Sequence, residues 1–358
     1  MTADPSTRHP HRPPPVARLR GPGDLAAALP HLCGFVPAES LVVVALHGPR
    51  SRVGLTMRVD LPARDHEGLL VRDLAARLAA AGADEAMVVL LTDAEARGGL
   101  PRARLVRRLR AEVRRAGLTV GDALLVRSGR WWSYVCDDDR CCPAEGTPVA
   151  ASSEALGLVQ AQAALDGRAV LPSRAELVAS LAAPSGEAGA AAAAALRPAE
   201  EQWDAQVARR GREGAGRSAL SLWRRSLAAA GSPPLDLPAA TTAALVVSLG
   251  DCLVRDEVLT WVLDDDAALL TLLLALAAAS PAPWDAPVCT LLSWVAHARG
   301  DGALANVALD RALEAVPRYP LALLSRQALD GQVMPDGVRE LLADSRTVLR
   351  EAHPWTAP

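Results

Sequence analysis

Strand-like and helix-like stretches alternate along the first part of the chain. Residues 41–46 and 86–91 are continuous apolar runs, typical of strands buried on both faces. Residues 52–61 alternate apolar and polar positions, which predicts a strand with one buried face. Apolar residues at helical spacing predict helices at 69–81 and 101–116. Because helices separate the strands, we expect an α/β fold with a mixed, partly parallel sheet and flanking helices.

Helical patterns replace the strand-like pattern beyond about residue 165. The last predicted strand, at 119–127, runs on into the motif WWSYV. The later segments predicted to be helical are 198–210, 217–230, 239–249, 252–263 and 267–279. We therefore expect an all-α domain to follow the α/β domain.

Residues 286–316 predict two helices joined by a short turn. Small or turn-forming residues recur in and just after this segment, at Gly300, Ala305, Ala308, Ala312 and Pro317. Small residues let two helices approach closely, and the pattern is typical of a tetratricopeptide hairpin. The second domain is therefore predicted to be tetratricopeptide-like, with a plain helical bundle as the alternative.

These patterns divide the chain into four parts. Residues 1–20, rich in proline and charge, predict a disordered leader. Residues 21–165 form the predicted α/β domain with a cysteine-rich loop. The low-complexity stretch PSGEAGAAAAAAL places a linker region at 166–197, and the helical domain is expected at 198–350.

Composition and charge limit the kinds of binding partner and the cellular compartment that we expect for the protein. All 38 basic residues are arginine, yet the net charge is −3, so the whole chain has no general attraction for nucleic acid or anionic membranes. The longest apolar run, 267–279, is too short to span a bilayer. The first residues lack the apolar core of a signal peptide. These features predict a cytoplasmic protein in a reducing environment, which favours metal binding or reduced thiols over stable disulfides.

The densest chemical cluster is the segment WWSYVCDDDRCCPAEGTP, which contains Cys136, Cys141 and Cys142. Its aspartates, proline and glycine predict a loop after a strand. The spacing of Cys136 and Cys141 allows both sulfur atoms to reach one point, whereas adjacent side chains diverge, so only one of Cys141 and Cys142 is expected to face Cys136. A tetrahedral zinc needs about four ligands. The N-terminal segment could supply the remainder from His31 or Cys33, so the predicted metal ligands are Cys136, Cys141, Cys142 and Cys33.

Other interpretations of these cysteines stay open from the sequence. They could be buried or surface thiols with no metal and no disulfide, or Cys136 and Cys141 could form a crosslink. A reactive thiolate is a further alternative, because the neighbouring Arg140 would lower a thiol pKa while the three aspartates would raise it.

A second candidate site follows from the predicted sheet. Ligands bind beyond the carboxyl ends of parallel strands, which would place Asp60 and Asp93 at one rim. Such a pair could hold Mg²⁺ or act in acid–base catalysis; the alternative is that both residues only cap helices and end strands.

The predicted helix at 101–116 is rich in arginine. Its basic positions are Arg102, Arg104, Arg107, Arg108, Arg110, Arg114 and Arg115. They could bind phosphate or an acidic partner, but a solvated helix face is the simpler interpretation, and no aromatic residues are interleaved for stacking on bases. We therefore do not expect nucleic-acid binding. His297 has no second ligand or base nearby in the sequence, which favours a partly buried structural histidine.

The ordered motifs LRGPGDLAAALPHLCGFVPAESLVVVAL, MRVDLP and WWSYVCDDDRCCPAEGTPV resemble domain-of-unknown-function family 4192, a group of actinobacterial proteins. The resemblance extends through RAVLPSRAELVASLAAP towards ALDRALEAVPRYPLALL and covers nearly the whole chain after the leader. The family carries no established activity, so the resemblance names relatives and implies no reaction.

Two classes of function remain after these steps. We favour a protein-interaction or scaffold module whose helical domain binds a protein partner, because the sequence contains no recognisable catalytic set. The alternative is a metal-dependent hydrolase that uses the strand rim or the cysteine loop, in which zinc would be the cofactor. Neither the partner nor a substrate follows from the residues.

Overall fold

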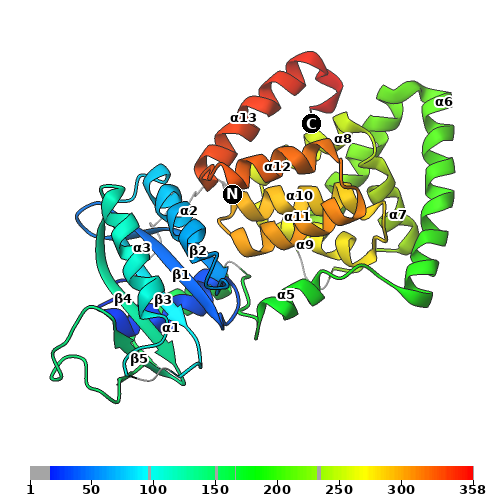
Figure 1. Ribbon diagram of the computed structural model, residues 1–358. Coiled ribbons are helices and arrows are strands. Elements are labelled where there is room, and N and C mark those ends of the chain that lie inside the picture. The colour runs from blue at the N-terminus through cyan, green and yellow to red at the C-terminus, as the bar shows by residue number, and fades with distance from the viewer. Residues whose placement is uncertain (1–16, 96–97, 150–151, 166, 232–234, 358) are drawn as a thin grey trace, which may run out of the picture. The chain divides into compact units, whose positions relative to one another are not determined.

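The computed structural model describes residues 17–95, 98–149, 152–165, 167–231 and 235–357 (Figure 1). The predicted disordered leader lies almost entirely outside these residues. The chain forms two compact units. The first contains Glu39–Arg72 and Asp84–Ala169 with the described residues before Cys33, and the second contains Cys33–Ala38, Asp73–Ala83 and Val170–Pro358.

A mixed sheet forms the centre of the first unit. Its strands among the described residues are β1 (Ser40–His47), β2 (Arg52–Asp60), β3 (Glu85–Leu91), β4 (Thr119–Arg127), β5 (Arg130–Ser133) and β6 (Thr147–Pro148). They lie in the order β2-β1-β3-β4-β5-β6, with β3 and β4 parallel and the other neighbours antiparallel. The predicted partly parallel sheet is therefore confirmed.

The two apolar runs occupy the interior of this sheet. Residues 41–45 of β1 and 88–90 of β3 are fully buried. Helix α3 (Ala103–Arg115) packs on β3 and β4, and buries Leu105, Leu109 and Val113 completely. Helix α1 (Pro22–Cys33) belongs to this unit up to Leu32, and α4 (Glu154–Leu165) belongs to it entirely, whereas α2 (Glu67–Ala80) is divided between the two units after Arg72. The continuous apolar runs alone thus located the buried strands, because both faces of a central strand must be apolar.

The second unit is mostly helical. Its helices are α5 (Arg174–Ser180), α6 (Gly186–Ala230), α7 (Ala239–Ser248), α8 (Cys252–Thr260), η1 (Trp261–Leu263), α9 (Asp266–Ala279), α10 (Asp285–Ala298), α11 (Gly302–Ala315), α12 (Pro320–Asp330), α13 (Pro335–Ala352) and η2 (Pro354–Thr356). The segment expected to be a linker contains α5 and the start of α6. A kink at Gly211, with φ of 69°, separates the two helices that the sequence predicts within α6. None of the described helices is long and apolar enough to cross a membrane.

The predicted hairpin is formed by α10 and α11. Gly300 has a φ of 76° in the turn, and Ala305, Ala308 and Ala312 of α11 are fully buried. Helix α12 packs against α10 and α11. Helices α8, α10 and α12 begin about 34 residues apart, close to the tetratricopeptide period. Helix α13 packs against both α8 and α10. The tetratricopeptide likeness stays a prediction.

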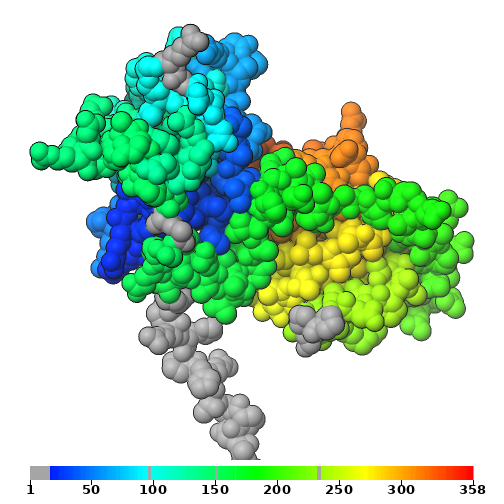
Figure 2. All heavy atoms as spheres, turned by 90° about the horizontal axis from the view of Figure 1, so that it is seen from below, coloured from blue at the N-terminus to red at the C-terminus, as the bar shows by residue number. Residues whose placement is uncertain are grey.

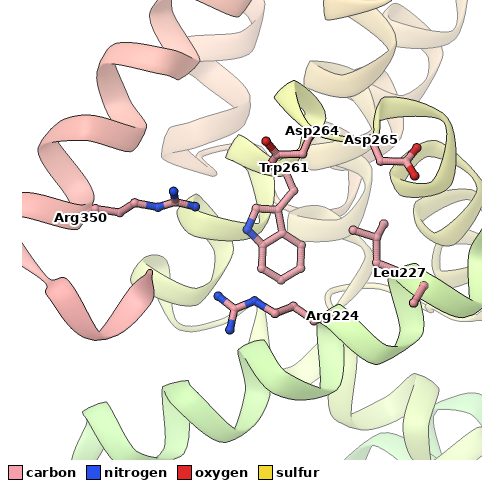
Figure 3. Close-up of a pocket in the computed structure, with 7 residues that line it drawn as sticks. Arg224, Leu227, Trp261, Asp264, Asp265 and Arg350 are labelled. Atoms are coloured by element: carbon pink, nitrogen blue, oxygen red, sulfur yellow. The ribbon is translucent and has the colours of Figure 1, made fainter. Parts of the chain in front are cut away.

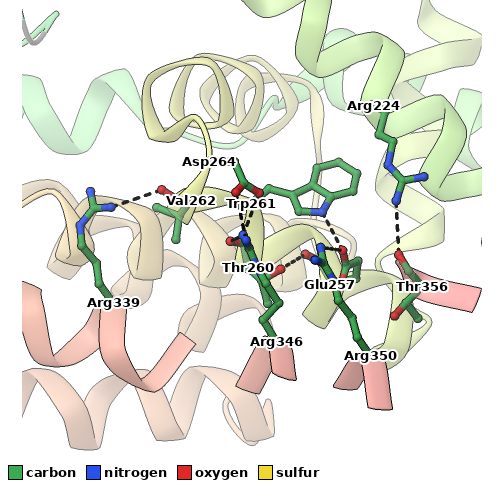
Figure 4. Close-up of polar contacts among 10 residues, drawn as sticks. All are labelled: Arg224, Glu257, Thr260, Trp261, Val262, Asp264, Arg339, Arg346, Arg350 and Thr356. Atoms are coloured by element: carbon green, nitrogen blue, oxygen red, sulfur yellow. Dashed lines mark hydrogen bonds and ion pairs between the residues drawn. The ribbon is translucent and has the colours of Figure 1, made fainter. Parts of the chain in front are cut away.

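Three arginines of α13, Arg339, Arg346 and Arg350, bind the last turn of α8 and the residues directly after it (Figure 4). The Arg339 Nε–H donates to the carbonyl of Ala298, the last residue of α10, at 3.1 Å. Arg346 donates to the carbonyl of Thr260, the last residue of α8, and pairs with Asp264 at 2.8 Å. The last carbonyls of a helix lack intrahelical partners. The guanidinium groups therefore supply the missing donors and also complement the negative end of each helix dipole.

The third arginine of α13 pairs with a buried carboxylate. Glu257 is fully buried and accepts hydrogen bonds from the Trp261 Nε1–H at 3.0 Å and from Arg350 at 2.6 Å. The hydrogen bond with Glu257 raises the pKa of Arg350 above its ordinary value. A buried carboxylate that loses its cation remains desolvated and uncompensated. The last turns of α13 therefore depend on this pair.

We predict that the substitution Arg350→Ala lowers the free energy of unfolding by about 2–3 kcal/mol, because it leaves the Glu257 carboxylate buried without its cation. Urea unfolding followed by circular dichroism measures the change. The control is Arg318→Ala, at an exposed position, which should change the free energy of unfolding by less than about 0.5 kcal/mol. Equal stabilities for the two variants would contradict the prediction.

His297 in α10 is buried, in line with the partly buried position that the sequence predicts. Its side chain is buried, and Nε2 lies 2.7 Å from the Val333 carbonyl oxygen, to which it donates as the neutral tautomer. Nδ1 is also buried and has no hydrogen-bond partner among the described residues. Burial lowers the pKa of His297, and the hydrogen bond to Val333 opposes this effect in part.

We predict that acidification destabilises the fold partly through His297. A lowered folded-state pKa means that the unfolded chain binds a proton more readily. The stabilising contribution is therefore complete above the ordinary histidine pKa of about 6.5 and is lost as the pH falls through the folded value. Free energies of unfolding should fall more steeply between pH 7 and pH 5 in the wild type than in His297→Gln. Parallel pH profiles would contradict this assignment.

Candidate functional site

The cysteine cluster lies in a loop between β5 and β6, residues 134–146. Hydrogen bonds to main-chain carbonyl oxygens hold the C-terminal side of this loop, residues 144–146, against β5. Arg130 of β5 donates from Nε to Glu145 at 2.8 Å and from a terminal nitrogen to Gly146 at 2.6 Å. The Trp132 Nε1–H donates to the Ala144 carbonyl at 3.0 Å. Figure 2 shows the loop, in green at the left, standing out from the surface of the first unit.

Ser133, at the end of β5, holds the N-terminal side of the loop by hydrogen bonds. The Ser133 hydroxyl donates to Asp122 of β4 at 2.8 Å and accepts the main-chain N–H groups of Val135 at 3.0 Å and Cys136 at 3.1 Å. The Tyr134 hydroxyl donates to the Pro101 carbonyl at 2.6 Å, and burial raises the pKa of this tyrosine. Cys136 therefore leaves the sheet at a defined position.

A turn built on Asp138 returns the chain towards Cys136. The Asp138 carbonyl accepts the main-chain N–H groups of Cys141 at 3.0 Å and Cys142 at 2.7 Å. Its carboxylate accepts the N–H of Arg140 at 2.9 Å, which is the Asx-turn geometry that aspartate favours. One member of the acidic triplet thus shapes the loop, a role that the sequence analysis missed although the residue type was a turn signal.

The three sulfur atoms of the loop converge. The Sγ atoms of Cys136, Cys141 and Cys142 all lie within 4.8 Å of one another, and those of Cys141 and Cys142 are 3.8 Å apart. The expectation that only one of the adjacent cysteines faces Cys136 is wrong, because the Asp138 turn directs both side chains inward. Burial first, and then the neighbouring thiols, raise the pKa of Cys142 to about 12.

Cys33, the fourth predicted ligand, belongs to the second compact unit, and its part in a metal site stays a prediction. Among the described residues, the set of metal-ligating side chains at mutual bonding distance contains these three cysteines and neither a carboxylate nor a histidine. Cys33 is the buried last residue of α1. None of the six cysteines, all of which the structure describes, is in a disulfide. Metal binding by any of them stays a prediction.

The carboxylates predicted at the strand rim lie at one edge of the sheet. Strands β2, β3 and β4 run in the same direction, since β1 lies antiparallel between β2 and β3. Asp60 forms an ion pair with Arg58 at 2.7 Å. The main-chain N–H of Asp93 donates at 2.9 Å to Glu39, which also accepts the Thr92 hydroxyl. Hydrolase chemistry at this rim stays an untested prediction.

Part of the arginine-rich face of α3 is used inside the first unit. Arg102 and Arg108 lie 3.4 and 3.9 Å from the buried carboxylate of Glu67, and Arg115 pairs with Glu112 at 2.5 Å. The hydrogen bond that Arg115 donates to Glu112 raises the pKa of Arg115. These contacts fit the simpler interpretation of the helix as a structural, partly solvated face.

A surface pocket of about 280 Å³ lies beside Trp261 in the second unit (Figure 3). Arg224 lies over the indole ring, 5.5 Å from its centroid, and Arg350 lines the same pocket. Both guanidinium groups are already bonded, Arg224 to the Thr356 carbonyl and Arg350 to Glu257. The pocket is therefore better explained as a gap between packed structural groups than as an anion site. Sequence reasoning gave no signal for it.

Residues 22–336 match a family described as a domain of unknown function, DUF4192. The chain belongs to this family. The match confirms the resemblance seen in the sequence, whereas the source organism that the resemblance implied is untested. The DUF4192 segment includes the cysteine loop and ends at the second residue of α13. Neither the curated proteins nor the solved structures provided a match. The family description carries no activity.

Gly146 provides a test of the loop geometry. It has a φ of 76°, and a Cβ atom there would lie 2.3 Å from the Trp132 ring. We predict that Gly146→Ala lowers the free energy of unfolding by about 1–3 kcal/mol more than Gly129→Ala, because overpacking adds to backbone strain. Gly129 is the matched control, with a φ of 72° and open space around it.

Chemical unfolding and tryptophan emission measure both variants. The emission of Trp132 should change only in Gly146→Ala, since only this substitution displaces the indole. Equal destabilisation with unchanged emission would show that the contact between Gly146 and Trp132 does not fix the loop.

Proposed function

We propose that the protein is a protein-interaction module whose docking surface is an apolar stripe on α13. The stripe consists of Met334, Leu341 and Val348, which are 40%, 49% and 66% exposed. Leu341 and Val348 are seven positions apart in α13, so they align along one side of this helix, whereas Met334 lies in extended backbone directly before its first residue. This exposed heptad spacing is the observation that carries the proposal.

The stripe is separate from the face by which α13 packs on its own unit. Val338 and Leu342 are buried on that face, and Arg339, Arg346 and Arg350 bind the neighbouring helices there. At about 100° per residue, Leu341 and Val348 lie roughly a quarter of a turn from Val338 and Leu342 and almost half a turn from the three arginines. The three arginines hold α13 in place, so the stripe is presented on a fixed helix and binding would cost little conformational entropy.

The charge beside the stripe indicates the chemistry of the partner. On the side away from the buried face, α13 carries the exposed acidic residues Glu340, Asp344 and Glu351. An amphipathic helix with apolar residues at heptad spacing and arginine or lysine at the flanking positions would complement both features. We therefore commit to a basic amphipathic helix of another protein as the occupant.

The cytoplasmic location and the absence of nucleic-acid binding stay predictions from the sequence. The hydrolase alternative is not advanced as a second function, because no observed group of carboxylates favours it over the interaction module. The docking stripe lies almost wholly beyond the DUF4192 segment, which ends at residue 336. Partner recognition by α13 would therefore add to whatever the DUF4192 segment does.

A pair of synthetic helical peptides tests the proposal. Both carry leucine at heptad positions; one is flanked by arginine and the other by glutamate. Fluorescence anisotropy with the full chain should show binding of the arginine peptide alone. The double variant Leu341→Glu/Val348→Glu should bind it at least about tenfold more weakly, because it places charge in the apolar contact.

The matched control is Leu323→Glu/Leu324→Glu, which adds the same charge at exposed leucines of α12. It should retain binding. Equal binding of both peptides, or equal loss in both double variants, would show that no specific site exists on α13. Self-association of the chain through the stripe, detected by sedimentation, would identify a second copy as the occupant and overturn the choice of partner.

A further inference from the structure

The spacing of the three loop sulfurs matches what one metal ion requires. A zinc–sulfur bond of about 2.3 Å places sulfurs about 3.8 Å apart in a tetrahedral site and about 4.0 Å apart in a trigonal one. The Sγ atoms of Cys141 and Cys142 are 3.8 Å apart, and all three sulfurs lie within 4.8 Å of one another. Metal binding therefore requires shifts of less than about 1 Å.

The loop holds these sulfurs together by bonds that do not involve them. Arg130 and Trp132 donate to the carbonyls of Glu145 and Ala144 at the C-terminal side of the loop. Ser133 accepts the main-chain N–H of Cys136 at the N-terminal side, and the Asp138 carbonyl accepts the N–H groups of Cys141 and Cys142 in the turn between them. Because main-chain hydrogen bonds already bring the three cysteines together, little ordering remains for the metal to induce. Such preorganisation raises affinity.

We infer that Cys136, Cys141 and Cys142 bind one zinc ion through three thiolates, with a water molecule as the fourth ligand. Thiolates select soft or borderline ions such as zinc over magnesium or calcium. Since no described carboxylate or histidine belongs to the group, the chain supplies three ligands, and the fourth position of a tetrahedral zinc faces solvent. Cys33 is not a ligand in this assignment, which revises the ligand set expected from the sequence.

Binding exchanges protons for the metal. Three thiols lose one proton each and form three zinc–sulfur bonds, so the complex of Zn²⁺ with three thiolates has a net charge of −1. The exposed carboxylates of Asp137, Asp138 and Asp139 flank the site in sequence. Their negative potential attracts a cation towards the loop before it is bound. The site is independent of the docking stripe on α13, so either proposal can fail alone.

A metal titration of the full, reduced chain under anaerobic conditions tests the site. Cadmium serves as the probe, because its bonds to thiolates absorb in the ultraviolet, and zinc is then added in competition. We expect saturation at one cadmium per chain, release of three protons per cadmium when the metal-free chain is titrated in unbuffered solution, and displacement of the bound cadmium by excess zinc without further proton release. Saturation without proton release, or no saturable binding, would overturn the proposal without any variant.

Single substitutions identify the ligands. Cys136→Ser, Cys141→Ser and Cys142→Ser should each weaken zinc binding by at least about tenfold, since even losing a group that only supports a ligand costs that much. Cys252→Ser, at an exposed cysteine outside the loop, is the matched control and should bind zinc as the wild type does. Cys33→Ser should also bind normally, and a loss there would restore Cys33 as the fourth ligand and refute the three-cysteine site.

Thermal unfolding with and without zinc separates ligand loss from misfolding. Without metal, the loop variants should unfold at the same temperature as the wild type, because the structure shows no bond from these sulfur atoms to described residues outside the loop. With zinc, only the wild type and the two control variants should melt at higher temperature. If mass spectrometry finds a disulfide among the loop cysteines after treatment with a reductant, the proposal of a metal site is also overturned.

Discussion

Guanidinium groups bonded to main-chain carbonyls hold both units in the shapes that their candidate sites require. Arg130 fastens the cysteine loop at Glu145 and Gly146, and Arg339 and Arg346 fasten α13 to helix ends. Arg311 in α11 follows the same rule, since it donates to the carbonyls of Leu181 and Ser280. A buried carbonyl without a donor costs about 1–3 kcal/mol, so these bonds decide which backbone arrangements are stable.

The use of arginine alone as the basic residue has a structural meaning in this light. A planar guanidinium can reach two carbonyls, or a carbonyl and a carboxylate, in one fixed geometry, whereas a lysine ammonium lacks that fork. Arg311 shows the full pattern, because it also pairs with the buried carboxylate of Asp285 at 3.0 Å. Burial raises the pKa of Asp285, and Arg311 opposes this rise. The chain thus joins distant backbone segments without relying on a large aromatic core.

The two candidate sites present their chemistry in different ways. The cysteine loop holds soft ligands on a short, heavily bonded hairpin of the first unit. The stripe on α13 is an exposed apolar surface, and the arginines on the opposite side of this helix bind the neighbouring helices. Neither site contains a recognisable sequence motif. The loop depends on the close contact of Gly146 with the Trp132 indole, and the stripe depends on exposed apolar side chains at heptad spacing on α13. Membership in DUF4192 identifies neither feature as functional.

The sequence by itself determined the element types and most of their positions. The buried strands β1 and β3 and the hairpin of α10 and α11 follow from local periodicity and small residues, because burial on one or both faces imposes a fixed spacing on the chain. The sequence also located the cysteine loop. Tertiary structure alone decided that Cys142 joins Cys136 and Cys141, since the Asp138 turn sets side-chain direction. It likewise decided that Arg350 neutralises Glu257 and that Met334, Leu341 and Val348 stay exposed. The pair of Arg350 and Glu257 joins residues far apart in the chain, which no local pattern encodes. The Asp138 turn is local, but the direction of its side chains depends on backbone geometry that residue types alone do not fix.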